Sequence, residues 1–212
     1  MTETTDARRG RPGYDQRAVL EVAVSAFNEF GYDATSMGVL AERLGLSKSA
    51  IYHHFAAKED ILELALDEAL AALEDVLTSV GTPGPDAASG PAAERLAAVL
   101  RGAVNVLVDR LPSVTLLLRV RGNTDVERRA LARRRAFDRA VAALVVEARD
   151  EGSLRSDIDP GIVSRLLFGM INSIVEWYRP GGPVDAATLA DDVLAVALDG
   201  LRTPESHDAK RT

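Results

Sequence analysis

The chain has 212 residues and a formal net charge of −7, and 47% of its residues are hydrophobic while only 5% are aromatic. It has no cysteine, which excludes disulfides and thiolate metal sites, and no apolar run approaches the roughly 18 residues that a membrane span needs. The N-terminus is polar and lacks the apolar core of a signal peptide. Alanine, leucine and valine dominate the apolar positions, and the first two favour helices over sheets. We therefore expect an all-α, cytoplasmic protein without a membrane partner.

The N-terminal part of the chain divides into a basic arm and a helix. Residues 1–13 carry three arginines, two glycines and a proline without periodicity, which indicates a flexible arm. From Asp15, apolar residues recur at steps of three and four, the pattern of an amphipathic helix. Gly31 is expected to end this helix as its C-terminal cap.

Two short helices around a glycine turn are predicted next. Thr35 is the expected N-cap of the first, which Gly45 ends, and Ser47 is the expected N-cap of the second. Ile51 and Phe55 are the inward anchors of this second helix. The order is that of a helix-turn-helix unit, whose second helix presents its N-terminal residues to base edges in the major groove of DNA.

The second short helix carries groups that suit DNA. Ser47 and Ser49 are small enough for a close backbone approach, and the unpaired N–H groups of a helix N-terminus suit phosphate oxygens. Lys48, Tyr52 and His53 supply donors on the outer face. The alternative for Tyr52 is an ordinary surface aromatic.

Metal and catalytic chemistry are disfavoured in the same stretch. Neighbouring helical side chains point about 100° apart, so the adjacent His53 and His54 cannot chelate one ion. The serines lack any motif of an activated nucleophile. We therefore expect that the protein is not an enzyme and has neither a metal site nor a cofactor. For His54, the alternative interpretation is a partly buried packing residue.

Residues 15–66 resemble the DNA-binding domain of the TetR family of bacterial transcriptional regulators. The resemblance rests on the run AFNEFGYDATSM followed by LAERLGLSKSAIYHHFAAKEDIL. It implies that seven residues approach DNA: Thr35, Ser47, Lys48, Ser49, Tyr52, His53 and Lys58. Among these, Thr35, Tyr52 and Lys58 are expected on phosphates, and Lys48, Ser49 and His53 nearer to bases. Three departures from the family pattern leave the base contacts open: Gly38, Ala50 and Ala57.

The acidic net charge does not exclude DNA as a partner, because phosphate contacts need basic residues only near the reading helix. Several basic residues gather there by sequence: Arg8, Arg9, Arg11, Arg17, Arg43, Lys48 and Lys58.

The rest of the chain is predicted to be helical. A long helix from Lys58 is expected to end in the turn-rich linker GTPGPDAASGP, residues 81–91. Further helices are predicted over 92–109, after Pro112, from a Thr124–Glu127 capping box to Gly152, from Asp159–Pro160, and over 185–201. We expect residues 14–57 to form the DNA-binding domain, 58–202 a ligand-binding and dimerisation domain, and 203–212 a frayed tail.

A ligand pocket is expected in the second domain. Its candidate residues are Asn105, Leu118, Arg119, Arg134, Phe137, Met170, Asn172 and Trp177. Apolar walls with a few polar anchors suit a hydrophobic ligand with a polar or anionic end. The arginines between Arg128 and Arg139 have two interpretations. They form a solvated face, or Arg119, Arg121 or Arg134 closes a pocket mouth and pairs with an anionic ligand.

The last two helices are expected to form a dimer interface. The helix from Asp159 has apolar residues on two faces, and one candidate partner for the second face is another subunit. In the TetR family the last two helices of each subunit form a four-helix dimer interface, and the resemblance implies the same here. The segment EWYRPGGPVDAATLA, residues 176–190, resembles a motif of a family branch that responds to acyl-CoA thioesters.

The sequence thus predicts a ligand-responsive repressor that binds a pseudo-palindromic operator as a homodimer. Its effector is expected to be a hydrophobic acid or an acyl-CoA thioester. Two alternatives stay open: a helical small-molecule-binding protein or enzyme with a vestigial DNA-binding motif, and a DNA-binding regulator without a small ligand.

Overall fold

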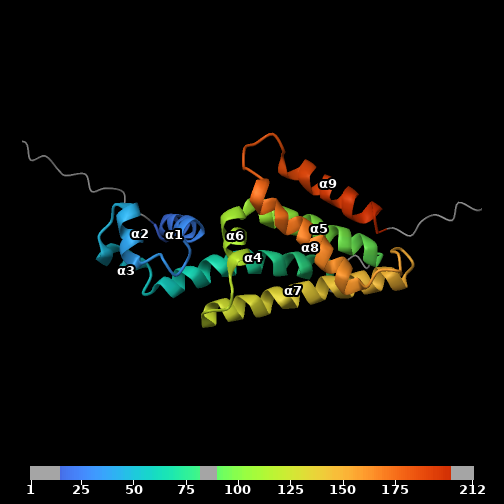
Figure 1. The fold of residues 1–212 in the computed structure, drawn as a ribbon, viewed down its shortest axis with the longest axis horizontal. Helices are drawn as coiled ribbons and strands as arrows, with labels where there is room; N and C mark the ends of the chain where they lie inside the picture. The colour runs from blue at the N-terminus through green and yellow to red at the C-terminus, as the bar shows by residue number, and fades with distance from the viewer. Residues whose placement is uncertain (1–14, 82–89, 202–212) are drawn as a thin grey trace, which may run out of the picture. The chain divides into compact units, whose positions relative to one another are not determined.

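The computed structural model of the chain describes residues 15–81 and 90–201, which form helices and no strand (Figure 1). The all-α prediction is confirmed. The helices are α1 (Gln16–Phe30), α2 (Met37–Leu44), α3 (Lys48–His54), α4 (Lys58–Gly81), α5 (Ala92–Asp109), α6 (Leu111–Arg119), α7 (Asp125–Asp150), α8 (Pro160–Trp177) and α9 (Ala186–Asp199). The predicted arm, most of the predicted linker and the predicted tail lie outside the described residues.

The described residues separate into two compact units, and the division falls between Leu62 and Glu63, inside α4. The N-terminal unit, residues 15–62, contains α1, α2, α3 and the start of α4. The C-terminal unit, residues 63–201, contains the rest of α4 and α5 to α9.

Hydrogen bonds between near neighbours explain where the helices of the N-terminal unit begin and end. Asp15 caps α1 by accepting from the N–H of Ala18 at 2.8 Å, and Ser47 caps α3 by accepting from the N–H of Ala50 at 3.2 Å. Gly45 ends α2 with a φ of 62°, in the left-handed region that glycine adopts without strain. The predicted end of α2 at Gly45 and the predicted cap of α3 at Ser47 are confirmed.

The prediction that Thr35 caps α2 is wrong, because the cap is Ser36. The Ser36 side chain accepts from the N–H of Val39 at 3.3 Å. Thr35 is only 1% exposed, and its hydroxyl donates to the carbonyl of Gly31 at 2.8 Å. The Thr35 hydroxyl therefore secures the loop that follows α1, and the exposed neighbour takes the cap.

The start of α4 is capped by a carboxylate from its own first turn. Position 57 is an alanine and offers no side-chain acceptor, while the Asp60 carboxylate accepts from the N–H of Ala57 at 2.8 Å. This is one half of a capping box. The predicted start of the long helix at Lys58 is confirmed.

The central helix of the C-terminal unit is α5, which contacts α6, α7, α8 and α9. Its buried stripe includes Leu96, Leu100, Ala103, Val104 and Leu107. The same helix approaches α4 closely at Gly102, where a β-carbon would meet Cγ1 of Val76 at 2.5 Å. The missing side chain at Gly102 therefore lets the two helices pack together.

The predicted capping box at the start of α7 is confirmed in its first half. Thr124 Oγ1 accepts from the N–H of Glu127 at 3.2 Å. The buried Glu127 carboxylate bonds beyond the cap residue and accepts from the N–H groups of Gly122 and Asn123, at 2.8 and 2.5 Å. It thereby orders the turn between α6 and α7.

Ion pairs join α7 to α4 within the C-terminal unit. Arg133 forms two parallel hydrogen bonds to Glu74, with Nε–Oε1 at 2.8 Å and Nη2–Oε2 at 2.7 Å. Its Nη1 also donates to Asp67 at 2.5 Å, and Arg129 donates to Glu63 at 2.6 Å. We call these five residues the α4–α7 ladder. Part of the arginine run thus has a structural role that neither interpretation of the sequence anticipates.

Candidate functional site

Five of the seven predicted DNA-contacting residues are exposed on α3 and at its N-cap: Ser47, Lys48, Ser49, Tyr52 and His53. We call them the α3 surface. Ile51 and Phe55 are buried, as predicted, and hold the opposite side of α3 to the core. Tyr52 is 52% exposed, and the hydroxyls of Ser47 and Ser49 lie 2.9 Å apart. The α3 surface therefore presents hydroxyl, ammonium and imidazole groups from the first two turns of one short helix.

Gly38 of α2 leaves room for the Lys48 side chain. A β-carbon at Gly38 would lie 3.1 Å from Cε and 3.4 Å from Nζ of Lys48. The Lys48 ammonium thus lies across the first turn of α2 at the edge of the α3 surface. The glycine that departs from the family pattern has a physical consequence, because a larger residue would displace this lysine.

The remaining two predicted DNA-contacting residues lie differently. Lys58 Nζ donates to the carbonyl of Tyr32 at 2.8 Å and lies 4.1 Å from the centre of the Tyr32 ring. One of its three N–H donors is therefore used inside the N-terminal unit. Thr35 is buried, so its hydroxyl is not at the surface where the resemblance placed it.

The two histidines do not form a metal site in this structure. The ring centres of His53 and His54 are 5.7 Å apart and the rings are tilted by 73°, an edge-to-face contact. Across residues 15–81 and 90–201, no group of three or more metal-ligating side chains is present. In the same ranges, no helix has both the length and the apolar character that crossing a bilayer requires.

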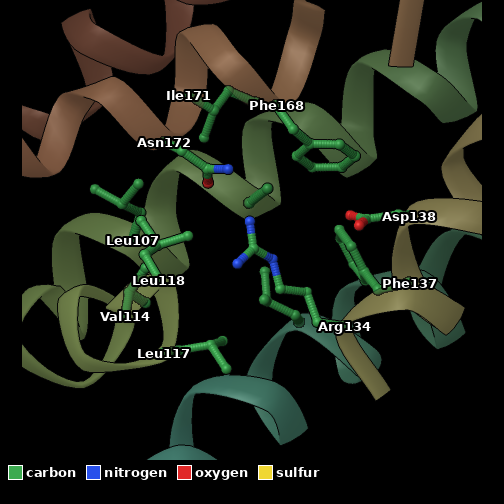
Figure 2. Close-up of a pocket in the computed structure, with 12 residues that line it drawn as sticks. Leu107, Val114, Leu117, Leu118, Arg134, Phe137, Asp138, Phe168, Ile171 and Asn172 are labelled. Carbon is green, nitrogen blue, oxygen red and sulfur yellow. The ribbon is translucent and has the colours of Figure 1, made fainter. Parts of the chain in front are cut away.

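A cavity lies in the C-terminal unit among α5, α6, α7 and α8, with one wall from α4 (Figure 2). Its volume is about 40 Å³. The lining consists of Leu73, Ala103, Leu107, Val114, Leu117, Leu118, Arg134, Phe137, Asp138, Phe168, Ile171 and Asn172. The Arg134 guanidinium reaches into the space between Leu118 and Asn172. The wall is thus apolar with a few polar groups, as is usual for small-molecule sites.

Four of the eight predicted ligand-binding residues line this cavity: Leu118, Arg134, Phe137 and Asn172. The other four do not line it, and their predicted role in ligand binding stays a prediction. Asn105 is exposed on α5, Arg119 is exposed at the end of α6, and Trp177 is 51% exposed at the end of α8. Met170 is half-buried on a part of α8 that does not border the cavity.

Several lining residues are missing from the sequence-based set. Asp138 lies one turn after Arg134 on α7, and Phe168 lies one turn before Asn172 on α8. Helical spacing from the predicted residues could have identified both. Leu73 comes from α4, far away in the sequence, and no local pattern points to it.

Asp138 is the acidic group of the cavity wall. Burial raises the pKa of the Asp138 carboxyl, and the charges of Arg134 and Arg139 oppose this rise. Beside it, the rings of Phe137 and Phe168 pack with their centres 5.6 Å apart. The polar and aromatic groups therefore meet on the α7–α8 side of the cavity.

Apolar side chains are exposed on α8 and α9 of the C-terminal unit. Leu166 on α8 is 65% exposed and Val196 on α9 is 70% exposed. Ile162 and Trp177 are exposed on α8 as well. The buried stripe of α8 consists of Val163, Leu167, Ile171 and Ile174. Each helix thus has one face in the core, and each exposes apolar residues elsewhere.

Two family descriptions match the chain. "Bacterial regulatory proteins, tetR family" matches residues 19–65, and "Tetracyclin repressor-like, C-terminal domain" matches residues 89–201. Among curated proteins, the chain is 30% identical to the HTH-type transcriptional repressor KstR2 of Rhodococcus jostii over 96% of this chain and 97% of that one. It is 27% identical to KstR2 of Mycobacterium tuberculosis over 86% of this chain and 90% of that one.

Solved structures show the same similarity. SCO3833 of Streptomyces coelicolor A3, described as a member of the TetR transcriptional regulator family, has 47% identity and a TM-score of 0.79, and the match covers 93% of this chain and 98% of that one. AibR, solved in complex with isovaleryl coenzyme A and operator DNA, has 25% identity and a TM-score of 0.70 over 86% of this chain and 97% of that one.

Proposed function

Because the chain belongs to the TetR family of bacterial regulatory proteins, we propose that it is a cytoplasmic transcriptional repressor that a small effector releases from DNA. The observation that carries the proposal is the α3 surface, where polar and basic side chains are exposed on a helix held by Ile51 and Phe55. A homodimer presents two such helices to successive major grooves of a pseudo-palindromic operator.

The DNA contacts follow from the exposure of each side chain. Lys48, Ser49 and His53 face base edges, because the first turns of a recognition helix enter the major groove. Ser47 and Tyr52 contact phosphates, and Lys58 joins them through its remaining N–H donors. No phosphate contact is assigned to the Thr35 hydroxyl, which is buried.

Substitutions on the α3 surface test this assignment. Lys48→Ala and Tyr52→Phe should each weaken operator binding by about 1–3 kcal/mol, while the helical circular dichroism and melting temperature stay unchanged. The measurement is a gel shift with DNA from upstream of the protein's own gene at fixed salt. Arg149→Ala is the charge-matched control, because Arg149 lies in the C-terminal unit and pairs with the adjacent Asp150. Unchanged affinity in both test variants would show that this surface does not read DNA.

The proposed homodimer is supported by the exposed apolar side chains of α8 and α9. Each fully buried large apolar side chain contributes about 1.5–3 kcal/mol, so leaving Leu166 and Val196 in water is costly for a monomer. A second copy of the chain covers the same surface on both subunits by twofold symmetry.

A charged residue at the interface tests the dimer. Val196→Arg should yield monomers in sedimentation at micromolar concentration and abolish operator binding, since a single half-site binds weakly. Val193 is less suitable because it is buried within its own subunit. Val146→Arg is the control, since Val146 is exposed on α7 outside the proposed interface. A wild-type chain that sediments as a monomer would rule the dimer out.

The cavity is the proposed effector site. Its apolar wall suits a hydrophobic group, and Arg134 and Asn172 provide a cation and an amide for a polar or anionic end. The acyl end of an acyl-CoA thioester or of a similar amphipathic acid suits this arrangement, and the relative AibR was solved with isovaleryl coenzyme A. The effector acts by binding more tightly to a conformation whose reading helices no longer match successive grooves. The effector class is tested by screening a metabolite panel for compounds that release the protein from operator DNA. Release by cationic drugs alone would contradict the proposed class of effector.

The competing function is that of a helical ligand-binding protein or enzyme with a vestigial DNA-binding motif. The cavity supports ligand binding in either case. A gel shift separates the two functions. The competing function predicts that the wild-type protein binds no upstream DNA specifically.

A further inference from the structure

A groove lies beside the cavity on the α7–α8 side of the C-terminal unit. Its volume is about 510 Å³. Four guanidinium groups line it, Arg134, Arg135 and Arg139 from α7 and Arg165 from α8, and Asp138 is the one acidic residue in the lining. The four guanidinium groups outnumber this single carboxylate. The groove therefore concentrates positive charge.

The groove arginines differ from the other arginines of α7 in their partners. Outside the groove, the α7 arginines bond to carboxylates: Arg128 to Asp125, Arg129 to Glu63, Arg133 to Glu74 and Arg149 to Asp150. Among the described residues, none of the four groove arginines forms an ion pair with a carboxylate. A protein that neutralises its neighbouring arginines but leaves four together in a hollow has a site suited to an anion of high charge.

The groove and the cavity adjoin each other. Four residues line both: Arg134, Asp138, Phe168 and Asn172. Figure 2 shows Arg134 reaching from α7 towards Asn172 on α8, at this junction. A ligand that occupies both hollows would therefore contact these side chains.

The two volumes differ more than tenfold. One water needs roughly 10–15 Å³ of such space, so a cavity of about 40 Å³ holds only a few non-hydrogen atoms. The groove, at about 510 Å³, is within the usual range for a whole cofactor-sized ligand of about 300–1,000 Å³. The phosphate-bearing part of a large ligand fits the groove and not the cavity.

We propose that the groove binds the phosphate groups of the effector through Arg135, Arg139 and Arg165, and that the cavity takes a short apolar tail. The ligand class is a short-chain acyl thioester of a carrier with several phosphates, such as coenzyme A. Arg134 and Asn172 hold the polar link between the two parts at the junction. This inference rests on the proposed function, because it assigns the parts of the same effector to two adjoining hollows.

Calorimetry on the full-length protein without DNA tests the proposal. The probes are acetyl-, isovaleryl- and octanoyl-coenzyme A, and isovaleryl pantetheine, which carries the same acyl group without phosphates. Isovaleryl-coenzyme A should bind at least tenfold more tightly than isovaleryl pantetheine and more tightly than octanoyl-coenzyme A. The first difference should shrink at high salt.

The variant Arg139→Gln/Arg165→Gln should bind the coenzyme A thioester and the pantetheine thioester with similar affinity. Arg139→Lys/Arg165→Lys keeps the charge and should retain part of the difference, while Arg149→Gln should retain all of it. A melting curve for each variant excludes misfolding as the cause. Equal binding of the two thioesters by the wild type overturns the proposal, as does the absence of binding by any coenzyme A thioester.

Failure of the groove proposal can be distinguished from failure of the proposed function. If operator DNA is bound and only an effector without phosphates releases it, the repressor stands and the groove proposal fails. If no DNA is bound, the proposed function fails, and calorimetry still decides whether the groove binds phosphates.

Discussion

Replacing Arg133 by glutamine should weaken the packing of α7 on α4. The substitution removes the two parallel hydrogen bonds to Glu74 and the bond to Asp67. Charge-assisted hydrogen bonds contribute about 1.5–3 kcal/mol when sheltered, but exposed ion pairs contribute only about 0.2–1 kcal/mol. The side chains of Arg133 and Glu74 are 35% and 43% exposed, so solvent screens the pair. We expect a loss of about 1 kcal/mol, or a melting temperature lower by roughly 2–4 °C.

The same contact makes the effect dependent on pH. The hydrogen bond from Arg133 is the main cause that holds the pKa of the Glu74 carboxyl below its ordinary value, and partial burial opposes it. Since the pKa in the folded state is the lower one, the stabilisation is fully present above the ordinary carboxyl pKa of about 4.3. It is lost as the pH falls through the lowered value.

Urea unfolding, monitored by tryptophan fluorescence, measures how much the contact between Arg133 and Glu74 contributes to the free energy of unfolding. The single tryptophan, Trp177, lies in the C-terminal unit and reports its unfolding. A double-mutant cycle with Arg133→Gln and Glu74→Gln should give a coupling energy of about 0.5–1 kcal/mol at pH 7. The coupling should fall towards zero below pH 4 and in 1 M salt. A coupling of zero at pH 7 and low salt, or one that stays constant in acid, would refute the reasoning.

Three further changes have defined outcomes. Ala57→Ser supplies the missing half of the capping box at the start of α4 and should stabilise the N-terminal unit by about 0.5–1 kcal/mol in thermal melts. An unchanged stability would contradict the cap geometry. Phe168→Ala removes the ring between cavity and groove, so it should cost about 1–3 kcal/mol of stability and shift the preferred acyl-coenzyme A towards longer chains in calorimetry. An unchanged length preference would argue against this partition. Gly38→Ala should raise the stability of α2 by about 0.5–1 kcal/mol, since alanine favours the helix. It should nevertheless weaken operator binding a few-fold, because the new β-carbon displaces Lys48. Stability and operator affinity that rise or fall together would refute the proposed contact between position 38 and Lys48.

The helix ends were predictable from the sequence because they depend on residues within about four positions of each other. The caps at Asp15, Ser47 and Asp159 bond to N–H groups of their own first turns. The α3 surface is predictable for the same reason, since the buried positions of Ile51 and Phe55 determine which side chains of a short helix face outward. The local pattern reaches its limit at Thr35 and Ser36. Both hydroxyls can cap α2, and the burial of Thr35 in the folded N-terminal unit leaves the cap to Ser36.

The cavity, the groove and the α4–α7 ladder depend on packing between helices far apart in the sequence. Arg133 and Arg134 are neighbours with the same side chain, yet one bonds to Glu74 and the other reaches into the cavity. Successive residues on a helix point about 100° apart, and a sequence pattern cannot say which direction meets a partner. Glu74 is 59 positions from Arg133, and the packing of α7 against α5 and α8 sets the rotation of α7 about its axis. The sequence by itself therefore determines the helices and the α3 surface, while the fold decides which arginines bond to carboxylates and which line the cavity and the groove.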